Sequence, residues 1–330
     1  MGIDELNRVA LPVTAAEPDH VFGHGVTLAL DGIVAELRGV RERWRDATRR
    51  PREIGGRELP SREALADIVA SLRGALFPMR LGPPDLRQES EDYYVGHTLD
   101  VALNRLLAQV KLELGYHARH GGPPDADIDA HALSVVRDFG ASLPAIRALL
   151  DSDVLAAFQG DPAARSVDEV LVCYPGIRAV IAHRIAHRLH RLGVPLLARI
   201  VAEISHGETG IDIHPGATIG AGFFIDHGTG VVIGETAEIG CNVRLYQAVT
   251  LGAKRFEIDA DGHLAKGGAR HPRVEDDVVI YAGATILGRI VIGRGATIGG
   301  NVWLTHSVAP GSRINQASTR DDSGNDRAGH

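Results

Sequence analysis

The spacing of apolar residues divides the chain into two regions. Up to about residue 206, apolar residues recur every three or four positions, which is the spacing of one face of an α-helix. The helical segments are 24–48, 62–76, 92–118, 130–158 and 167–191, and stretches that contain Pro or Gly separate them. This pattern predicts an all-α N-terminal domain over residues 1–206.

From Ile211 onwards the apolar period changes to six residues. Thirteen aliphatic residues follow at this spacing, with two interruptions: Ile213, Ile219, Ile225, Ile233, Ile239, Leu245, Leu251, Val274, Ile280, Ile286, Ile292, Ile298 and Leu304. Neither an α-helix nor an alternating β-strand has a period of six. The period is typical of a β-solenoid, in which each hexapeptide supplies one short strand and one corner and three hexapeptides make one coil. We therefore predict a parallel β-helix over residues 207–311.

Two insertions interrupt the six-residue period. Two extra residues lie around Gly228-Thr229-Gly230, and 17 extra residues form a loop over 252–273. A solenoid accepts insertions at its corners, and such loops often form the binding face. Residues 312–330 are polar and charged, and we expect them to form a disordered tail.

Composition agrees with this division and argues against several classes of function. Of the 39 glycines, 20 lie between residues 201 and 311, and only 5% of the chain is aromatic, as expected for a repeat built from tight turns. The net charge of −7 argues against a nucleic-acid partner. No apolar run reaches the ~18–20 residues that a membrane span needs. With only two cysteines, Cys173 and Cys241, we expect a cytoplasmic protein without a disulfide framework.

Four short segments carry a resemblance to a known family. They are Asp212–Ala217 (DIHPGA), Ile225–Ala237 (IDHGTGVVIGETA), Gln247–Gly252 (QAVTLG) and Arg270–Pro272 (RHP). Together they resemble the serine O-acetyltransferases of bacteria and plants, over roughly half of the chain. The resemblance implies a left-handed β-helix, preceded here by the extended helical region of one branch of the family. It also implies transfer of an acetyl group from acetyl-CoA to the hydroxyl of L-serine, on the route to cysteine.

The resemblance implies that His227 and Asp212 form the catalytic dyad. Attack of an alcohol on a thioester requires a base, and histidine suits this role because imidazole changes charge near neutral pH. A carboxylate improves such a base by fixing its tautomer and stabilising the imidazolium. Asp212 precedes His227 by 15 residues, close to one coil of ~18. The alternative for either residue is a solvated or turn-capping role at a corner.

Serine recognition requires acidic groups for its ammonium and a cation for its carboxylate. By resemblance, Asp161 and Asp226 hold the amino group. Arg270 and His271 bind the carboxylate and the serine end of the site, from a loop that reaches a neighbouring subunit. The alternatives are a helix N-cap for Asp161, which precedes Pro162, and a surface salt bridge for Arg270.

The resemblance also implies a co-substrate site and partners. Backbone amides at corners such as Ala282 and Gly300 would bind acetyl-CoA in the groove between adjacent solenoids. The subunits would form a trimer, or a dimer of trimers paired through the helical domains. Family members that dock into O-acetylserine sulfhydrylase do so through a C-terminal isoleucine, whereas this chain ends in Ala328-Gly329-His330, which argues against that complex.

Other functions remain to be weighed against serine acetylation. The same base would serve transfer to homoserine, a sugar or another hydroxyl, and a solenoid can also be a non-catalytic scaffold. A zinc enzyme of the γ-type carbonic anhydrase kind needs histidine pairs at solenoid spacing, which His227, His263, His271 and His306 do not form. His183, His187 and His190 share one side of a helix among arginines, which we interpret as a polar helix face. We therefore assign no metal.

Overall fold

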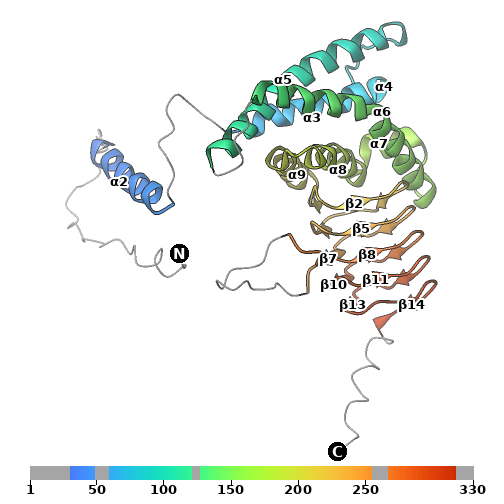
Figure 1. Cartoon of the computed structure of the whole chain (residues 1–330). Helices are drawn as coiled ribbons and strands as arrows, with labels where there is room; N and C mark the ends of the chain where they lie inside the picture. Colours follow the sequence, from blue (N-terminus) through green and yellow to red (C-terminus); the bar gives the residue numbers. More distant parts are fainter. Residues whose placement is uncertain (1–29, 49–58, 121–126, 255–266, 317–330) are drawn as a thin grey trace, which may run out of the picture. The chain divides into compact units, whose positions relative to one another are not determined.

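The computed structural model describes residues 30–48, 59–120, 127–254 and 267–316. The chain forms two compact units, residues 1–57 and residues 58–330. Within the first unit, the described residues form helix α2 (Leu30–Thr48), and every other described element belongs to the second unit (Figure 1).

The first part of the second unit is helical throughout, as the apolar spacing predicted. Its elements are α3 (Arg62–Leu76), α4 (Pro78–Leu81), the 3₁₀-helix η1 (Gln88–Ser90), α5 (Glu91–Arg119), α6 (Ile128–Gly160), α7 (Val167–Cys173), α8 (Pro175–Arg191) and α9 (Pro195–Thr209). The expected segment 167–191 is two helices, because α7 ends at Cys173 and α8 begins at Pro175, with Tyr174 between them. Proline fits the first turn of a helix, where its missing N–H has no partner to lose.

Side-chain caps explain where several of these helices begin. The hydroxyl of Ser61 accepts a hydrogen bond from the N–H of Ala64 at the start of α3, and Ser166 caps α7 in the same way. A cap of this kind satisfies one of the free N–H groups of the first turn. At the other end of the helical region, α9 stops at Gly210, whose φ of 68° reverses the chain direction without steric cost.

In the described ranges, fourteen short strands then form three parallel sheets. The sheet order is β1-β4-β7-β10-β13 for sheet A, β2-β5-β8-β11 for sheet B and β3-β6-β9-β12-β14 for sheet C. The strands are β1 (Asp212–Ile213), β2 (Thr218–Ile219), β3 (Phe224–Ile225), β4 (Val232–Ile233), β5 (Glu238–Ile239), β6 (Arg244–Leu245), β7 (Thr250–Gly252), β8 (Arg273–Val274), β9 (Val279–Ile280), β10 (Thr285–Leu287), β11 (Val291–Ile292), β12 (Thr297–Ile298), β13 (Trp303–Leu304) and β14 (Arg313–Ile314). From β1 to β13, consecutive strands belong to successive sheets, which is typical of a left-handed β-helix of hexapeptide repeats, and β14 then pairs with β12 in sheet C.

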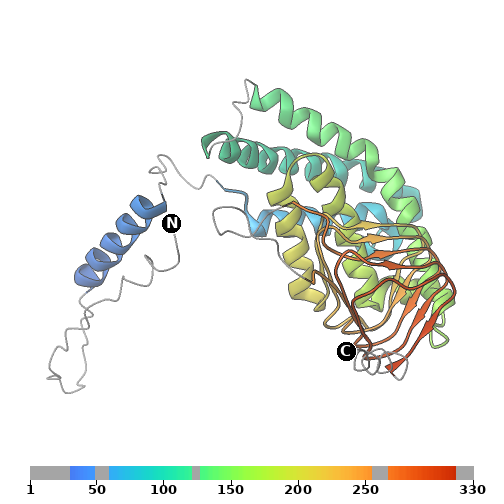
Figure 2. The ribbon, with the colours of Figure 1, turned by 60° about the horizontal axis from the view of Figure 1, so that its bottom comes forward.

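The six-spaced aliphatic residues form the core of this β-helix, as predicted. All thirteen are buried, and the registers stack them on one another from coil to coil. In sheet A, for example, Ile213 pairs with Ile233 and Ile233 pairs with Leu251. Burying such a side chain contributes about 1.5–3 kcal/mol relative to leaving it exposed. Figure 2 shows the successive coils from the bottom end of the stack.

Helices α6, α8 and α9 cover the first coil of the β-helix. The guanidinium of Arg184 donates to the backbone oxygens of Ile219 (2.5 Å) and Gly220 (2.6 Å). A carboxylate oxygen of Asp153 accepts the N–H of Phe223 at 2.8 Å. These bonds satisfy backbone groups of the first coil that have no earlier strand to pair with.

The burial of α8 corrects one sequence-based interpretation. We interpreted His183, His187 and His190 as a polar helix face, but His183 is only 3% exposed. Helix α8 packs against other helices on one side and against the β-helix on the other, so most of its surface is buried. A helix in that position need not present a polar face. Burial lowers the pKa of His183 well below its ordinary value, and nearby Arg184 adds to this effect.

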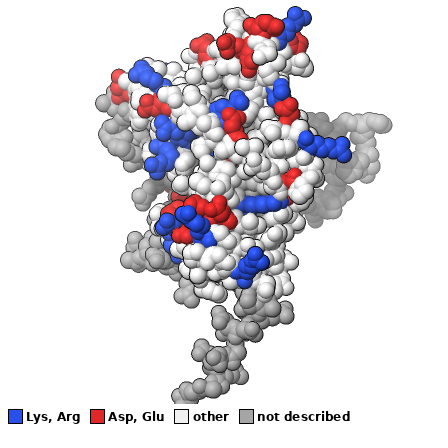
Figure 3. All heavy atoms as spheres, turned by 90° about the vertical axis from the view of Figure 1, so that its right-hand side faces the viewer, with Lys and Arg blue, Asp and Glu red and all other residues white. Residues whose placement is uncertain are grey.

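Three further predictions concern the surface and the chain ends. No helix in the described ranges is long and apolar enough to cross a membrane. On the face drawn in Figure 3, acidic and basic side chains are intermixed.

Strand β14 lies within the stretch 312–330 that we expected to be disordered, and residues 317–330 lie outside the described residues. The prediction about the C-terminal residues 328–330 therefore stays a prediction.

Candidate functional site

The β-helix has three edges, and six of the eight predicted site residues fall on two of them, while Asp161 follows α6 and Asp212 lies in β1. Edge CA is the column of corners that leads from sheet C to sheet A, and edge AB leads from sheet A to sheet B. Edge CA consists of residues 226–231, 246–249, 281–284 and 299–302. The described part of edge AB consists of residues 214–217, 234–237, 253–254, 267–272 and 288–290.

His227 lies on edge CA, in the corner that carries the two-residue insertion. Its backbone has a φ of 59°, a left-handed conformation that is uncommon for residues other than glycine. The side chain is 70% exposed, and its Nε2 atom lies 3.8 Å from Oδ1 of the preceding Asp226. The corner with the insertion thus presents an exposed imidazole, with a carboxylate beside it.

Asp226 and Asp161 both lie near His227. Asp226 is buried, and its Oδ2 accepts a hydrogen bond from the guanidinium of Arg244 at 3.0 Å. Asp161 follows the end of α6 and interacts electrostatically with both Arg244 and His227. Two carboxylates, one guanidinium and one imidazole therefore share one end of edge CA.

Asp161 is held in its charged form by its neighbours. It accepts a hydrogen bond from the hydroxyl of Tyr174, and its own backbone turn supplies another from the N–H of Ala163. These two bonds lower the pKa of Asp161, and the same pairing raises the pKa of Tyr174 to about 12. The N-cap alternative for Asp161 is wrong, because no helix of the described residues begins at Pro162: Asp161 is the C-cap residue of α6, and its carboxylate binds a tyrosine 13 residues away.

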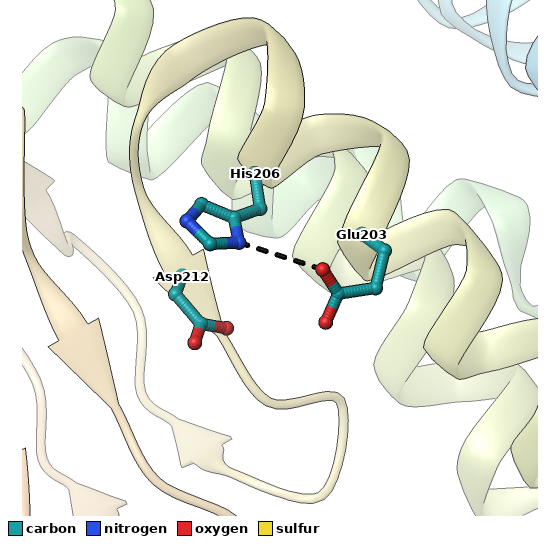
Figure 4. Close-up of side chains that lie close together, drawn as sticks. All are labelled: Glu203, His206 and Asp212. Atoms are coloured by element: carbon teal, nitrogen blue, oxygen red, sulfur yellow. Dashed lines mark hydrogen bonds and ion pairs between the residues drawn. The ribbon is translucent and has the colours of Figure 1, made fainter. Parts of the chain in front are cut away.

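Asp212 lies on the coil before the corner of His227, where it pairs in register with Val232, the first residue after that corner. It belongs to β1 of sheet A, and the corner that holds His227 stacks directly on the chain before it, with the N–H of Gly230 donating to the oxygen of Gly210 at 2.8 Å. Figure 4 shows the Asp212 carboxylate beside His206 and Glu203 of α9. Among the described residues, the carboxylate that pairs with His227 is Asp226 and not Asp212.

Glu203, His206 and Asp212 form the group of side chains best suited to hold a metal ion in the described part of the chain. One ligand atom from each lies within 4.8 Å of the others. Nδ1 of His206 is 3.5 Å from Glu203, whose other oxygen is 2.6 Å from Arg199. Arg199 already supplies a positive charge to this group, which weakens its attraction for a cation.

Arg270 and His271 lie on edge AB, away from His227 within one protomer. The guanidinium of Arg270 pairs with Glu235 at 2.5 Å, and its backbone N–H donates to the hydroxyl of Thr236 at 2.9 Å. Although partial burial opposes it, Arg270 holds the pKa of Glu235 below its ordinary value. The structure therefore does not bring these two residues together with His227, Asp226 and Asp161.

His271 is buried and neutral at physiological pH. Burial, helped by the charge of Arg270, lowers its pKa to about 4. Nδ1 accepts the backbone N–H of Thr236 at 3.1 Å, which leaves the proton on Nε2. The ring packs against Gly234, where a β-carbon would lie about 2.1 Å from Nε2, so only glycine fits at this position.

Ala282 and Gly300 lie on edge CA, in the third and fourth corners of the column. The N–H of Asn301 donates to the backbone oxygen of Ala282 at 2.9 Å, which joins the two corners. Among the described residues, the N–H groups of Ala282 and Gly300 have no hydrogen-bond acceptor. Two backbone donors are therefore available along the edge that carries His227.

Sequence reasoning missed several residues of this edge. Arg244 lies in β6 on the next coil, where it pairs in register with Phe224 of β3, and its side chain reaches Asp226 two residues further along that chain. Tyr246 stacks on Tyr281 with ring centroids 4.9 Å apart, and Arg244 lies over Tyr246. The side-chain oxygen of Gln247 is buried without a partner among the described residues. No sequence pattern indicated Tyr174, because it reaches the site from the start of helix α8 and not from the hexapeptide repeat.

Comparisons with known proteins agree with this architecture. The bacterial transferase hexapeptide family (six repeats) matches residues 271–306. The chain is 60% identical over 267 residues to a plasmid-encoded serine acetyltransferase of Synechococcus elongatus, covering 80% of this chain and 84% of the relative. It is 51% identical over 162 residues to a serine acetyltransferase of Mycobacterium tuberculosis, covering 49% of this chain and 67% of the relative.

A solved structure shares both parts of the fold. Serine acetyltransferase 1 of Entamoeba histolytica, determined in complex with L-cysteine, superposes with a TM-score of 0.66 at 36% sequence identity. The match covers 78% of this chain and 87% of that chain.

Proposed function

The chain belongs to the serine acetyltransferase family, and from this premise we propose that its catalytic centre lies on edge CA with His227 as the general base. The reaction is transfer of an acetyl group from acetyl-CoA to the hydroxyl of serine, a step of cysteine biosynthesis. One observation supports this location more than any other: Asp161, Asp226 and Arg244 converge beside the exposed imidazole of His227.

The proposed reaction is a direct transfer without an acetylated enzyme. His227 takes the proton from the serine hydroxyl as the oxygen attacks the thioester carbonyl carbon. The carbon–sulfur bond then breaks, and the imidazolium returns the proton to the departing sulfur. Asp212 stabilises the imidazolium in this proposal. Its position on the adjacent coil, in register with Val232 just after the corner of His227, supports the role, which requires its carboxylate to turn from His206 towards His227.

The charges around His227 suit the ammonium group of serine. Asp161 and Asp226 contribute two negative charges, and Arg244 compensates one of them. The remaining single negative charge matches one ammonium group, and buried or partly buried charges are stable when paired in this way. We propose that Asp161 and Asp226 bind the amino group, while Arg244 keeps their combined charge low enough for the empty site to be stable.

Binding of the serine carboxylate requires a second subunit in this proposal. Arg270 and His271 are proposed to bind the carboxylate, but they lie on edge AB, whereas the ammonium site lies on edge CA. If three β-helices surround a threefold axis, edge AB of one copy can face edge CA of the next. We therefore propose a homotrimer with three composite sites, and a pair of trimers joined through the helical domains as the alternative.

Acetyl-CoA is proposed to lie along edge CA. The free N–H groups of Ala282 and Gly300 are in line with the corner of His227, where they can bind the amide oxygens of the pantetheine arm. The thioester then approaches His227 from the side of the third and fourth corners. Cys173 and Cys241 are both free and exposed, which supports the proposed cytoplasmic location.

An acceptor screen tests the proposed site. Release of free CoA from acetyl-CoA is measured with serine, homoserine, threonine and simple sugars. We expect serine to be preferred, and His227→Ala to lower kcat with serine by about 10²–10⁴-fold. His306→Ala, which removes an exposed imidazole elsewhere on the β-helix, serves as the control. Turnover of the His227→Ala variant near the wild-type rate would refute the assignment of the base.

A further inference from the structure

Helix α2 carries an apolar stripe that the described residues leave uncovered. Leu30, Ile33, Leu37, Val40 and Trp44 are each between 45% and 58% exposed. No residue of α2 is buried. A helix with so large an exposed apolar side normally packs against a partner.

The spacing of this stripe identifies the kind of partner. From Leu30, five of the six large apolar residues of α2 follow at intervals of three, four, three and four, which is a seven-residue repeat, and the sixth, Val34, lies next to Ile33 at position e. The next interval of three leads to Ala47. A repeat of 3.5 residues per turn is the pattern of a coiled coil, whereas a helix on a globular core follows 3.6 and needs a wider stripe. The pattern therefore favours another helix of the same kind.

The residue types in the repeat favour more than two strands. Leu30 and Leu37 occupy the a positions, and the β-branched Ile33 and Val40 occupy the d positions. Leucine at a with a β-branched residue at d shifts coiled coils from dimers towards trimers and tetramers. In a parallel arrangement, Glu36 at position g faces Arg41 at position e of the neighbouring helix, and these charges attract.

The charges of α2 argue against a membrane surface as the partner. The helix carries four basic and four acidic residues, so its net charge is zero: Arg38, Arg41, Arg43 and Arg45 against Asp31, Glu36, Glu42 and Asp46. Amphipathic helices that bind anionic lipid have a strongly basic polar face. The helix is also weak alone, because it has only 19 residues and two of them, Gly32 and Gly39, disfavour helix.

We propose that α2 forms a parallel coiled coil with the α2 helices of other copies of this chain. Thirteen residues separate Thr48 from Arg62, and such a stretch spans up to about 45 Å, so helices of different subunits can meet. The proposal does not depend on the catalytic residues. It assigns residues 30–47 as a second subunit contact, separate from the β-helix.

Fluorescence of Trp44 tests whether the stripe is covered. The chain has two tryptophans, so Trp303→Phe leaves Trp44 as the single reporter. We expect emission at short wavelength and weak quenching by acrylamide. Leu37→Asp at position a should increase the quenching constant several-fold, whereas Ala35→Asp at the outward position f should leave it unchanged. Equal quenching in the two variants would overturn the proposal.

Cross-linking tests whether the cover comes from another copy. In full-length protein with Cys173→Ser and Cys241→Ser, Val40→Cys places a thiol at position d and Ala35→Cys places one at position f. A short bismaleimide should join two chains several-fold faster through position 40 than through position 35, and Leu37→Asp should abolish the difference. A protected Trp44 without this cross-link would mean that the stripe packs on its own chain, which also overturns the proposal. Acetyl transfer by the Leu37→Asp variant should stay within about twofold of wild type, so this result is independent of the proposed active site.

Discussion

The guanidinium of Arg184 on α8 binds both carboxylate oxygens of Asp153 on α6, at 3.0 and 3.1 Å. The two side chains are only 5% and 0% exposed. The same pair of residues also bonds the backbone of the first β-helix coil. It is therefore the polar junction between the helical region and the β-helix.

Asp153→Asn should destabilise the protein strongly. The substitution leaves a buried guanidinium without its counter-charge, and loss of one partner of a buried ion pair costs about 3–5 kcal/mol. Asp151→Asn, two residues away on α6, is the matched control. Asp151 pairs with Arg147 at the surface, where a salt bridge contributes about 1 kcal/mol or less. Denaturant unfolding measures both, and equal losses would show that the junction contributes no more than a surface pair.

Asp212→Asn and Asp226→Asn should have different kinetic effects. In the proposed mechanism Asp212 stabilises the imidazolium of His227, so its loss should lower kcat by about 10²–10⁴-fold with little change in the KM for serine. Asp226 is proposed to bind the ammonium group, so its loss should mainly raise that KM. If Asp226→Asn instead lowers kcat more than Asp212→Asn does, then Asp226 is the catalytic partner of His227, as the 3.8 Å separation would allow.

Subunit mixing tests the composite site. His227→Ala and Arg270→Ala should each lower serine acetylation when made alone, the second mainly through a higher serine KM. In trimers formed by coexpression of both variants, an intact His227 meets an intact Arg270 at one interface in four. About a quarter of wild-type activity should then return. No recovery would mean that both residues act within one protomer, which requires edges AB and CA to approach each other in a way that this fold does not show.

Stability should fall as the pH drops from 7.5 to 5.5. Burial lowers the pKa of His183 and His271 in the folded chain, that of His271 to about 4. The unfolded chain binds protons at these histidines below about pH 6.5, and the folded chain does not. Each of them therefore removes up to about 1.4 kcal/mol of unfolding free energy per pH unit in this range.

His183→Leu isolates one of these contributions. The variant should lose less stability between the two pH values than wild type, whereas His306→Leu at an exposed site should behave as wild type. Denaturant midpoints at pH 7.5 and 5.5 provide the comparison. The same pH dependence in all three proteins would show that His183 takes up its proton in the folded state.

The β-helix was predictable from sequence because one rule governs all its coils. Each coil repeats the same steric demand, so inward aliphatic residues such as Ile213, Ile233 and Leu251 recur once per coil, at 18 residues or at 20 where the two-residue insertion lies. The helical region follows no such repeat. His183 stands at a helical position that resembles a polar face, and only the packing of α8 between two layers determines that it is buried.

For the candidate site, the resemblance named residues whose roles stay predictions, and the structure shows how those residues are arranged. Family motifs supplied His227, Asp226 and Asp161, which the structure places together. The resemblance placed Arg270 in a loop that reaches a neighbouring subunit, and the structure adds that this loop lies on edge AB whereas His227 lies on edge CA. Arg244 escaped notice although it lies one coil from Asp226, since an arginine in a strand of a repeat has no distinctive spacing of its own.

The contacts that α6 and α8 make with the first coil have a consequence for how the molecule assembles. Without Arg184 and Asp153, the backbone oxygen of Gly220 and the N–H of Phe223 would have no hydrogen-bond partner at the end of the β-helix. Unpaired strand edges invite further strands from other molecules. We therefore expect a fragment of residues 211–316 to associate end to end into fibres. In the full chain, the helices cover the first coil and prevent this association.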